Sequence, residues 1–316
     1  MTKVFTRQEI LEVIPNIDLI TELERGFIAF SEGKAMVPLP GEMFFEELQG
    51  EVQIKYGHLE NDPYYIVKIA SIFPGNITSG LATSNGSMLV FSAKNGQLLA
   101  VLLEEGKLTA VRTAVAGAVA AKYLAPKKIT CIGIIGTGAQ ARLQLEYLEK
   151  VTDCKDVLVW GRNEAHAKAY AEDMNKKGFN VKVAKNTADI GSSCNLIVTA
   201  TAAVAPVILD KHIRKGTHIT AIGADNSEKN ELEPLTLARA NLVVTDSLEQ
   251  SRSSGEVFQT WINGLISDND VLELGNIIRD KAFQRSAENQ ITVADLTGAA
   301  IQDIQIAKAV YEQLSK

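Results

Sequence analysis

The sequence predicts an α/β fold in which a doubly wound parallel sheet accompanies a second, α+β domain. An apolar run of strand length, residues 129–135, ends at a glycine-rich turn and is followed by helix formers. Beyond it, short apolar segments alternate with helical ones, which is typical of a parallel sheet. Before it, at residues 51–56, apolar and polar residues alternate with a period of two, which places Val52, Ile54 and Tyr56 on one face of a strand and indicates a separate sheet.

The glycine-rich turn gives the strand, turn and helix of a dinucleotide-binding, Rossmann-type fold. Gly136 would allow the tight turn, and Gly138 would let backbone N–H groups approach a pyrophosphate. Ala141 stands where a third glycine is usual. The diphosphate would lie at the positive end of the helix. The alternative is a turn that uses glycine only for its geometry, and the flanking strand and helix favour the nucleotide site.

Composition and charge argue for a soluble protein with a small-molecule partner. The chain of 316 residues is 46% hydrophobic and 22% charged, and it has room for two domains. Its net charge of −6, with scattered Lys and Arg, argues against a nucleic-acid surface. The charged N-terminus and the lack of a long apolar run predict no membrane segment and a cytoplasmic location. Cysteines and histidines without metal-ligand spacing predict no metal site.

The first half is predicted to contain two helices, a sheet and a third helix. Thr6 and Glu9 form a capping box for the first helix, and residues 19–31 form the second. The strand at 64–71 is apolar on both faces except for Lys68, which must find an anion or lose its proton. The alternative is a lysine that snorkels to solvent. An Asn-Gly pair at 95–96 indicates a hairpin between strands at 88–91 and 98–103.

A nearly all-apolar helix at 108–124 carries Arg112 in its first turn. A guanidinium beside free helix N–H groups makes a carboxylate or phosphate site. The alternative is a salt bridge to Glu104 or Glu105. Later elements are predicted as strands at 157–160, 180–183, 196–199, 218–222 and 242–245, a helix at 164–177, and a closing helix at 295–313 that returns to the first domain.

The end of the second strand of the glycine-turn domain bears on which nucleotide is bound. An NAD site normally has an acid there, to accept from the ribose hydroxyls. This strand ends in Trp160-Gly161-Arg162-Asn163, with no acid in the turn, and Arg162 could pair with a 2′-phosphate. The sequence therefore favours NADP(H), with NAD(H) possible. If Arg162 is only a surface arginine, cofactor choice would be loose.

The order of several motifs resembles the ornithine cyclodeaminase and mu-crystallin family over essentially the whole chain. The motifs are Lys68, F-P-G-N, R-T-A-V-A-G-A-V-A-A-K-Y-L-A, I-G-I-I-G-T-G-A-Q-A, V-T-A-T and A-I-G-A-D. The resemblance implies an NAD(P)-binding Rossmann domain, residues 126–298, inserted in a substrate-binding and dimerisation domain, residues 1–125 with 299–316. A homodimer is therefore expected.

The resemblance also assigns site residues. Lys68 and Arg112 match the family's substrate cations, and Asp225 matches its acid, so these three are the expected catalytic residues. Its matches to cofactor-lining positions are Thr83, Arg112, Ala139, Gln140, Thr201, Ala221, Gly223 and Lys229. The glycine turn and the strand end add Gly136, Gly138, Arg162 and Asn163 to the expected cofactor residues. Many members carry another substrate-binding arginine before the Lys68 strand. This chain has no arginine from Phe27 to Val111, and Lys55 is the candidate replacement.

Members of the family handle an imine carbon next to a carboxylate. The expected reaction is NAD(P)H-dependent reduction of Δ1-pyrroline-2-carboxylate or Δ1-piperideine-2-carboxylate to L-proline or L-pipecolate. Lys68 and Arg112 would bind the substrate carboxylate. Asp225, or Lys68 if burial lowers its pKa, would donate a proton to the ring nitrogen or balance its charge. Alternatives are ornithine cyclodeaminase, alanine dehydrogenase and a mu-crystallin-like binding protein that uses NADPH as a structural ligand.

Overall fold

The computed structural model describes residues 1–316, and its contacts divide the chain into two compact units. Unit 1 comprises Met1–Arg112 and Ala300–Lys316, and unit 2 comprises Thr113–Ala299. The division therefore falls inside helix α3 (Lys107–Leu124), just after Arg112. The domain limits expected from the sequence, near residues 125 and 299, remain a prediction.

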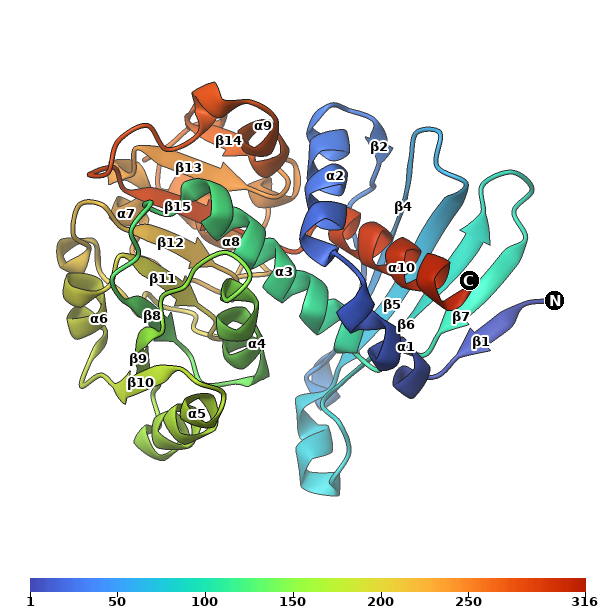
Figure 1. Cartoon of the computed structure of the whole chain (residues 1–316), viewed down its shortest axis with the longest axis horizontal. Helices are drawn as coiled ribbons and strands as arrows, with labels where there is room; N and C mark the ends of the chain where they lie inside the picture. The colour runs from blue at the N-terminus through green and yellow to red at the C-terminus, as the bar shows by residue number, and fades with distance from the viewer. The chain divides into compact units, whose positions relative to one another are not determined.

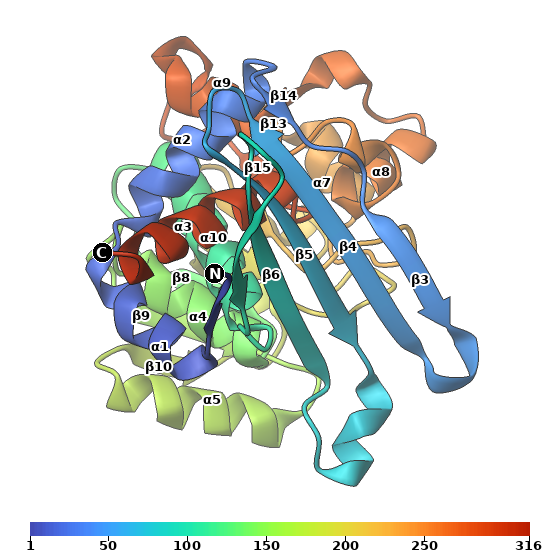
Figure 2. The same ribbon diagram turned by 90° about the vertical axis from the view of Figure 1, so that its right-hand side faces the viewer.

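Unit 1 is built on a seven-stranded, mostly antiparallel sheet with the order β1-β7-β6-β5-β4-β2, and β3 pairs with β4 at the far side. Figure 2 shows β3, β4, β5 and β6 side by side. The strands are β1 (Lys3–Phe5), β2 (Ala35–Met36), β3 (Gly41–Phe45), β4 (Gly50–Leu59), β5 (Tyr64–Ile72), β6 (Ser84–Ser92) and β7 (Leu98–Leu102). The predicted hairpin is confirmed, and Gly96 takes the positive φ of its turn.

Three further helices belong to unit 1: α1 (Arg7–Val13), α2 (Leu19–Ser31) and α10 (Ala300–Leu314). The capping box of Thr6 and Glu9 starts α1 as predicted. Helix α2 has the predicted bounds and buries a stripe of Leu19, Leu23 and Phe27. Helix α10 lies across β4, β5 and β6 and covers one face of the sheet (Figure 1).

Unit 2 contains an eight-stranded sheet, parallel throughout, with the order β10-β9-β8-β11-β12-β15-β13-β14. Its strands are β8 (Ile132–Ile135), β9 (Asp156–Trp160), β10 (Asn180–Val183), β11 (Leu196–Thr199), β12 (His218–Ala221), β13 (Leu242–Thr245), β14 (Val271–Glu273) and β15 (Thr292–Asp295). The order runs outward in both directions from β8, so the sheet is doubly wound. The predicted fold class is confirmed.

Helices cover both faces of this sheet (Figure 1). They are α4 (Ala139–Leu148), α5 (Glu164–Lys176), α6 (Thr187–Ser193), α7 (Pro234–Arg239), α8 (Gly255–Ile262) and α9 (Leu274–Arg279). The core on one face includes Ile190 of α6, Leu237 of α7 and Val257 of α8. Gly133 leaves room for this layer, because a Cβ there would lie 2.4 Å from Ile190. No helix of the chain combines the length and apolar character needed to cross a membrane.

The prediction of one closing helix from residue 295 is wrong at its start. Residues 292–295 form β15, which is fully buried between β12 and β13, and α10 begins only at Ala300. The run Ile291-Thr292-Val293 favours a strand because β-branched residues fit a pleated sheet. Gly298, at φ 85°, then lets the chain turn into the helix.

Candidate active site

Unit 2 has a crevice of about 280 Å³ at the carboxyl ends of β8, β9 and β11. It is lined by Gly136, Thr137, Trp160, Gly161, Arg162, Ala200, Thr201, Ala202, Ala203 and Val207. The strand order changes direction between β8 and β11, and doubly wound sheets bind nucleotides at such a switch point. Three predicted cofactor residues, Gly136, Arg162 and Thr201, therefore lie in one crevice.

The turn after β8 fits a diphosphate. Gly136 has φ 122°, and a Cβ there would lie 2.4 Å from the carbonyl oxygen of Ala200, so only glycine fits. Gly138 starts α4 without a side-chain cap, and nothing lies within 4 Å of where its Cβ would be. The first N–H groups of α4, from Ala139 onward, are thus available to an anion. Gln140 adds a buried Nε2 without a hydrogen-bond partner.

The two residues after β9 differ in what they do. Arg162 lines the crevice, where a cation suits an adenosine 2′-phosphate. Asn163 caps α5, with its Oδ1 accepting from the backbone N–H of Ala165 at 2.9 Å. This bond gives Asn163 a structural task that the sequence analysis did not foresee, beside its predicted role at the cofactor.

A buried glutamate that sequence reasoning missed connects the loops after β11 and β12. Glu231 is 0% exposed. Its Oε1 accepts from the backbone N–H and hydroxyl of Thr201 at 2.6 and 2.7 Å, and its Oε2 accepts from the Thr199 hydroxyl and the Gly223 N–H, each at 2.8 Å. Burial raises the pKa of Glu231, while these bonds oppose the rise. One carboxylate thereby fixes two predicted cofactor residues, Thr201 and Gly223.

The predicted acid Asp225 lies in the loop after β12, past the buried Ala221. Its carboxylate is partly exposed and pairs with Lys229, with Nζ and Oδ1 2.5 Å apart. The same loop is held by Asn226, whose Oδ1 accepts from the backbone N–H of Lys229 at 3.0 Å. Lys229 is therefore engaged by the acid of its own loop.

Unit 1 holds a buried cluster of charged groups beneath α10. Lys68 of β5, 1% exposed, donates from Nζ to Oδ1 of Asp303 at 3.0 Å. Arg112 of α3, 5% exposed, donates from Nε to the same oxygen at 3.0 Å and from Nη1 to Oε1 of Gln302 at 3.0 Å. Lys68 thus has the anion that its position in the strand required, and the snorkelling alternative is wrong.

The cluster carries more positive than negative charge. Lys55 of β4 is buried and stands opposite Lys68 in the register of β4 and β5. Burial alone would raise the pKa of Asp303, but Arg112, Lys68 and Lys55 together hold it below its usual value. Burial lowers the pKa of Lys68 to about 7, although Asp303 opposes this. Lys55, Lys68 and Arg112 outnumber the nearby acids Asp303 and Glu104, which favours binding of a further anion, such as a substrate carboxylate.

The alternative for Arg112, a salt bridge to Glu104 or Glu105, is wrong. Glu104 instead accepts from the backbone N–H of Leu108 at 2.7 Å and of Thr109 at 3.2 Å, at the start of α3. Glu105 pairs with Arg7 at 3.3 Å. Both glutamates are satisfied locally, so Arg112 turns to α10, a partner far away in the sequence. Thr83, another predicted cofactor residue, is exposed in unit 1 just before β6.

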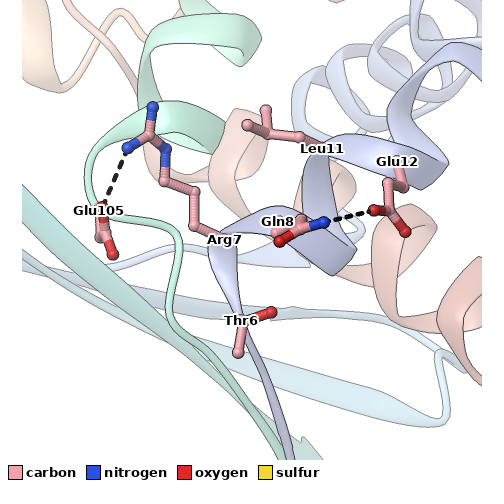
Figure 3. Close-up of a pocket in the computed structure, with 6 residues that line it drawn as sticks. All are labelled: Thr6, Arg7, Gln8, Leu11, Glu12 and Glu105. Carbon is pink, nitrogen blue, oxygen red and sulfur yellow. Dashed lines mark hydrogen bonds and ion pairs between the residues drawn. The ribbon is translucent and has the colours of Figure 1, made fainter.

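A wider hollow of about 520 Å³ lies at the start of α1 (Figure 3). Its lining side chains pair with one another: Arg7 with Glu105, and Gln8 with Glu12 at 3.1 Å. None of the predicted site residues lines it. Because Arg7 is already paired with Glu105 and the walls are largely exposed, this hollow is not the candidate site.

The fold and these two sites define a class: a nucleotide-binding α/β protein whose other unit has a buried cation cluster suited to an anion. The family can be stated as well. The chain belongs to the ornithine cyclodeaminase/mu-crystallin family, whose sequence model matches residues 1–316. The resemblance drawn from the motifs is thereby confirmed.

Three relatives show the range of activities near this chain. It is 33% identical over 287 residues to a Δ1-pyrroline-2-carboxylate reductase of Bacillus cereus, covering 90% of this chain and 88% of that one. The Δ1-pyrroline-2-carboxylate reductase of Thermococcus litoralis, in complex with NADH and L-proline, superimposes with a TM-score of 0.92 at 32% identity. This match covers 99% of this chain and 97% of that one. An archaeal alanine dehydrogenase dimer with bound NAD superimposes with a TM-score of 0.91 at 34% identity, and the match covers 99% of this chain and 95% of that one.

Proposed function

We propose that this protein reduces a cyclic ketimine carboxylate, Δ1-pyrroline-2-carboxylate or Δ1-piperideine-2-carboxylate, to the corresponding L-imino acid with NAD(P)H. The observation that carries the proposal is the buried cluster in which Lys68 and Arg112 share one oxygen of Asp303 and each keeps further N–H donors for a substrate carboxylate. The nucleotide crevice of unit 2 and the family relatives named as imine reductases support it.

Each residue has a defined task in this proposal. The nicotinamide, when bound, supplies the hydride that reduces the imine carbon. Lys68 and Arg112 bind the carboxylate and hold the C=N bond in one orientation, and Lys55 adds positive charge. Asp225 donates to, or balances the charge of, the imine nitrogen. Lys68 is a second proton donor, because its pKa of about 7 suits an acid at neutral pH.

NADP(H) is the proposed preferred cofactor, with NAD(H) accepted. Arg162 in the crevice, and the lack of an acid in the turn after β9, support a 2′-phosphate site. In this proposal Arg162→Ala raises the KM for NADPH about tenfold or more and changes that for NADH little, because only NADPH carries the phosphate. Equal effects on both cofactors would contradict the assignment.

Turnover tests the function directly. Purified protein with NADPH or NADH and each cyclic imine should consume the reduced cofactor and produce L-proline or L-pipecolate. Lys68→Ala and Asp225→Ala should abolish this consumption and still bind the cofactor. The reductase assignment is wrong if neither imine causes cofactor oxidation. It is also wrong if ammonia is released from L-ornithine instead, which would indicate a cyclodeaminase.

Alanine dehydrogenase is the second candidate activity. The archaeal alanine dehydrogenase at 34% identity favours it. In that reaction pyruvate and ammonia replace the cyclic imine, and the same cations would bind the pyruvate carboxylate. Cofactor oxidation that requires pyruvate plus ammonia, and does not occur with cyclic imines, would select this activity over ketimine reduction.

We also infer that the protein is a homodimer through the face of the unit 1 sheet opposite α10. Lys55, Lys68 and Gly57 face α10, so Tyr56 and Ile69 point the other way, and they are 43% and 40% exposed. Met36 on β2 and Met43 on β3, 72% and 47% exposed, pair with His58 and Val52 of β4, so they extend the same apolar surface. Exposed apolar surface of this kind marks an interface, and the related archaeal alanine dehydrogenase is a dimer.

Light scattering on the purified protein tests the dimer. Ile69→Glu should convert it to a monomer, because a carboxylate would be buried in the interface. Leu235→Glu is the matched control, since Leu235 is 50% exposed on unit 2 and its replacement should leave the mass unchanged. A wild-type monomer, or a dimer that survives Ile69→Glu, would refute this interface.

A further inference from the structure

Asp303 is the one acid bonded to the two cations Lys68 and Arg112, and no sequence motif marks it. It is 1% exposed on α10, and it offers a single oxygen, Oδ1, to Lys68 Nζ and Arg112 Nε, both at 3.0 Å. Its other oxygen, Oδ2, is buried without a hydrogen-bond partner. A buried carboxylate with only half of its acceptors used is unusual, and it calls for a functional explanation.

We propose that Asp303 is a positioning residue of the substrate site: it orients Lys68 and Arg112 and keeps Lys68 charged, so that their remaining N–H groups bind the substrate carboxylate. The inference rests on the proposed function, because it assumes that these two cations bind a carboxylate. Asp303 itself acts only through them and does not touch the substrate in this proposal.

The geometry defines which donors remain for a ligand. Arg112 uses Nε for Asp303 and Nη1 for Gln302, a neighbouring residue of the same helix, and this leaves the N–H groups of Nη2. Lys68 has three N–H groups and uses one for Asp303. Two adjacent residues of α10 thus fix the plane of the guanidinium, and the shared oxygen sets the ammonium beside it. This is the pre-organisation that a carboxylate site needs.

The charges around Lys68 explain why an acid is required. Four groups from different elements interact with it: Asp303 of α10, Arg112 of α3, Lys55 of β4 and Glu104 before α3. Burial is the largest influence on the pKa of Lys68, and Arg112 and Lys55 act in the same direction, so that the pKa lies at about 7. Asp303 is the main opposing influence. Without its charge, Lys68 would be mostly neutral at neutral pH and would bind a carboxylate poorly.

The test is the pH dependence of substrate and product binding in Asp303→Asn. In the wild type, kcat/KM for the cyclic imine should fall as pH rises through about 7, as Lys68 loses its proton. In Asp303→Asn this fall should move to lower pH by roughly one unit or more. KM at neutral pH should rise about tenfold, kcat should change less, and cofactor affinity should stay the same. A variant whose pH profile keeps its wild-type position would refute the role.

Calorimetric binding of L-proline over the same pH range separates this inference from the proposed function. If L-proline binds and Asp303→Asn shifts its pH dependence, the positioning role holds even when no imine is turned over. In a Lys68→Met background, Asp303→Asn should no longer shift the profile, because the lysine through which it acts is gone. A shift that persists there would overturn the inference.

A conservative variant covers the case in which Asp303→Asn does not fold. Asp303→Glu keeps the charge but moves the oxygens by one methylene. It should keep the wild-type pH dependence and raise KM, because Lys68 stays charged while the two cations are displaced. If Asp303→Glu moves the pH dependence instead, charge at this position does not control Lys68 and the inference fails.

Discussion

Replacing Glu231 with glutamine should loosen the crevice of unit 2, and the structure indicates by how much. Each carboxylate oxygen accepts from one backbone N–H group, that of Thr201 on one side and that of Gly223 on the other. A glutamine must place its NH2 group against one of these N–H groups in either orientation. Hydroxyls can rotate to accept, but a backbone N–H cannot. One buried donor therefore loses its partner, which costs about 1–3 kcal/mol.

A second contribution comes from the lost charge, since the remaining bonds become neutral and weaken by about 1 kcal/mol. Relief of repulsion with Glu256 and Asp295, whose pKa values are raised chiefly by burial and partly by Glu231, offsets some of this loss. We expect a net destabilisation of about 2–3 kcal/mol. Because the loops carrying Thr201 and Gly223 are released, cofactor affinity should also fall by about tenfold.

Urea unfolding and a cofactor titration measure both effects of Glu231→Gln. Glu228→Gln is the matched control: Glu228 is exposed in the same loop, and its change should stay within about 0.5 kcal/mol. If Glu231→Gln unfolds at the wild-type urea concentration and binds the cofactor as tightly, the four hydrogen bonds do not hold the loops together.

Three further predictions follow from single positions. Gly136→Ala should abolish cofactor binding, because its Cβ would lie 2.4 Å from a carbonyl oxygen at φ 122°; a titration with normal affinity would contradict the tight turn. Between pH about 7 and 10.5 the unfolded chain holds a proton on Lys68 that the folded chain lacks. The free energy of unfolding of the wild type should therefore rise with pH relative to that of Lys68→Met, by up to about 1.4 kcal/mol per pH unit. Parallel curves of unfolding free energy against pH for the two proteins would exclude this. Thr6→Ala should cost about 1 kcal/mol by removing the cap of α1, with unchanged turnover; an equal melting temperature would show that the capping box is dispensable.

The sequence predicts the elements whose pattern is local. The strand around Lys68 is a continuous apolar run. The turn at Gly136 has a backbone geometry that only glycine fits, so the glycine itself marks the turn. Helix α2 is predicted to the residue because Leu19, Leu23 and Phe27 have helical spacing, and the structure adds Asp18 as its cap. Lys68 and Arg112 of the cation cluster were found in this way, since a buried charge stands out in an apolar segment.

The rest depends on contacts between residues distant in the sequence. Asp303 is 235 residues from Lys68, and nothing around it marks it as the partner of a cation. Glu231 stands in a polar stretch, and its hydrogen bonds to Thr201 and Gly223 exist only because two loops distant in the sequence meet around it. The edge strand β3 exposes all five of its residues, so it lacks the alternation of buried and exposed positions that identifies a strand. Whether Asp225 acts on the same substrate as the two cations stays a prediction.

The late position of β15 in the chain has a consequence for synthesis. This strand lies between β12 and β13, yet it is translated after all the other strands of its sheet, and α10 with Asp303 follows it. A nascent chain on the ribosome therefore holds an incomplete parallel sheet, and a lysine and an arginine without their acid, until its last few dozen residues emerge. Premature termination in this stretch would leave both units unfinished and exposed to proteolysis.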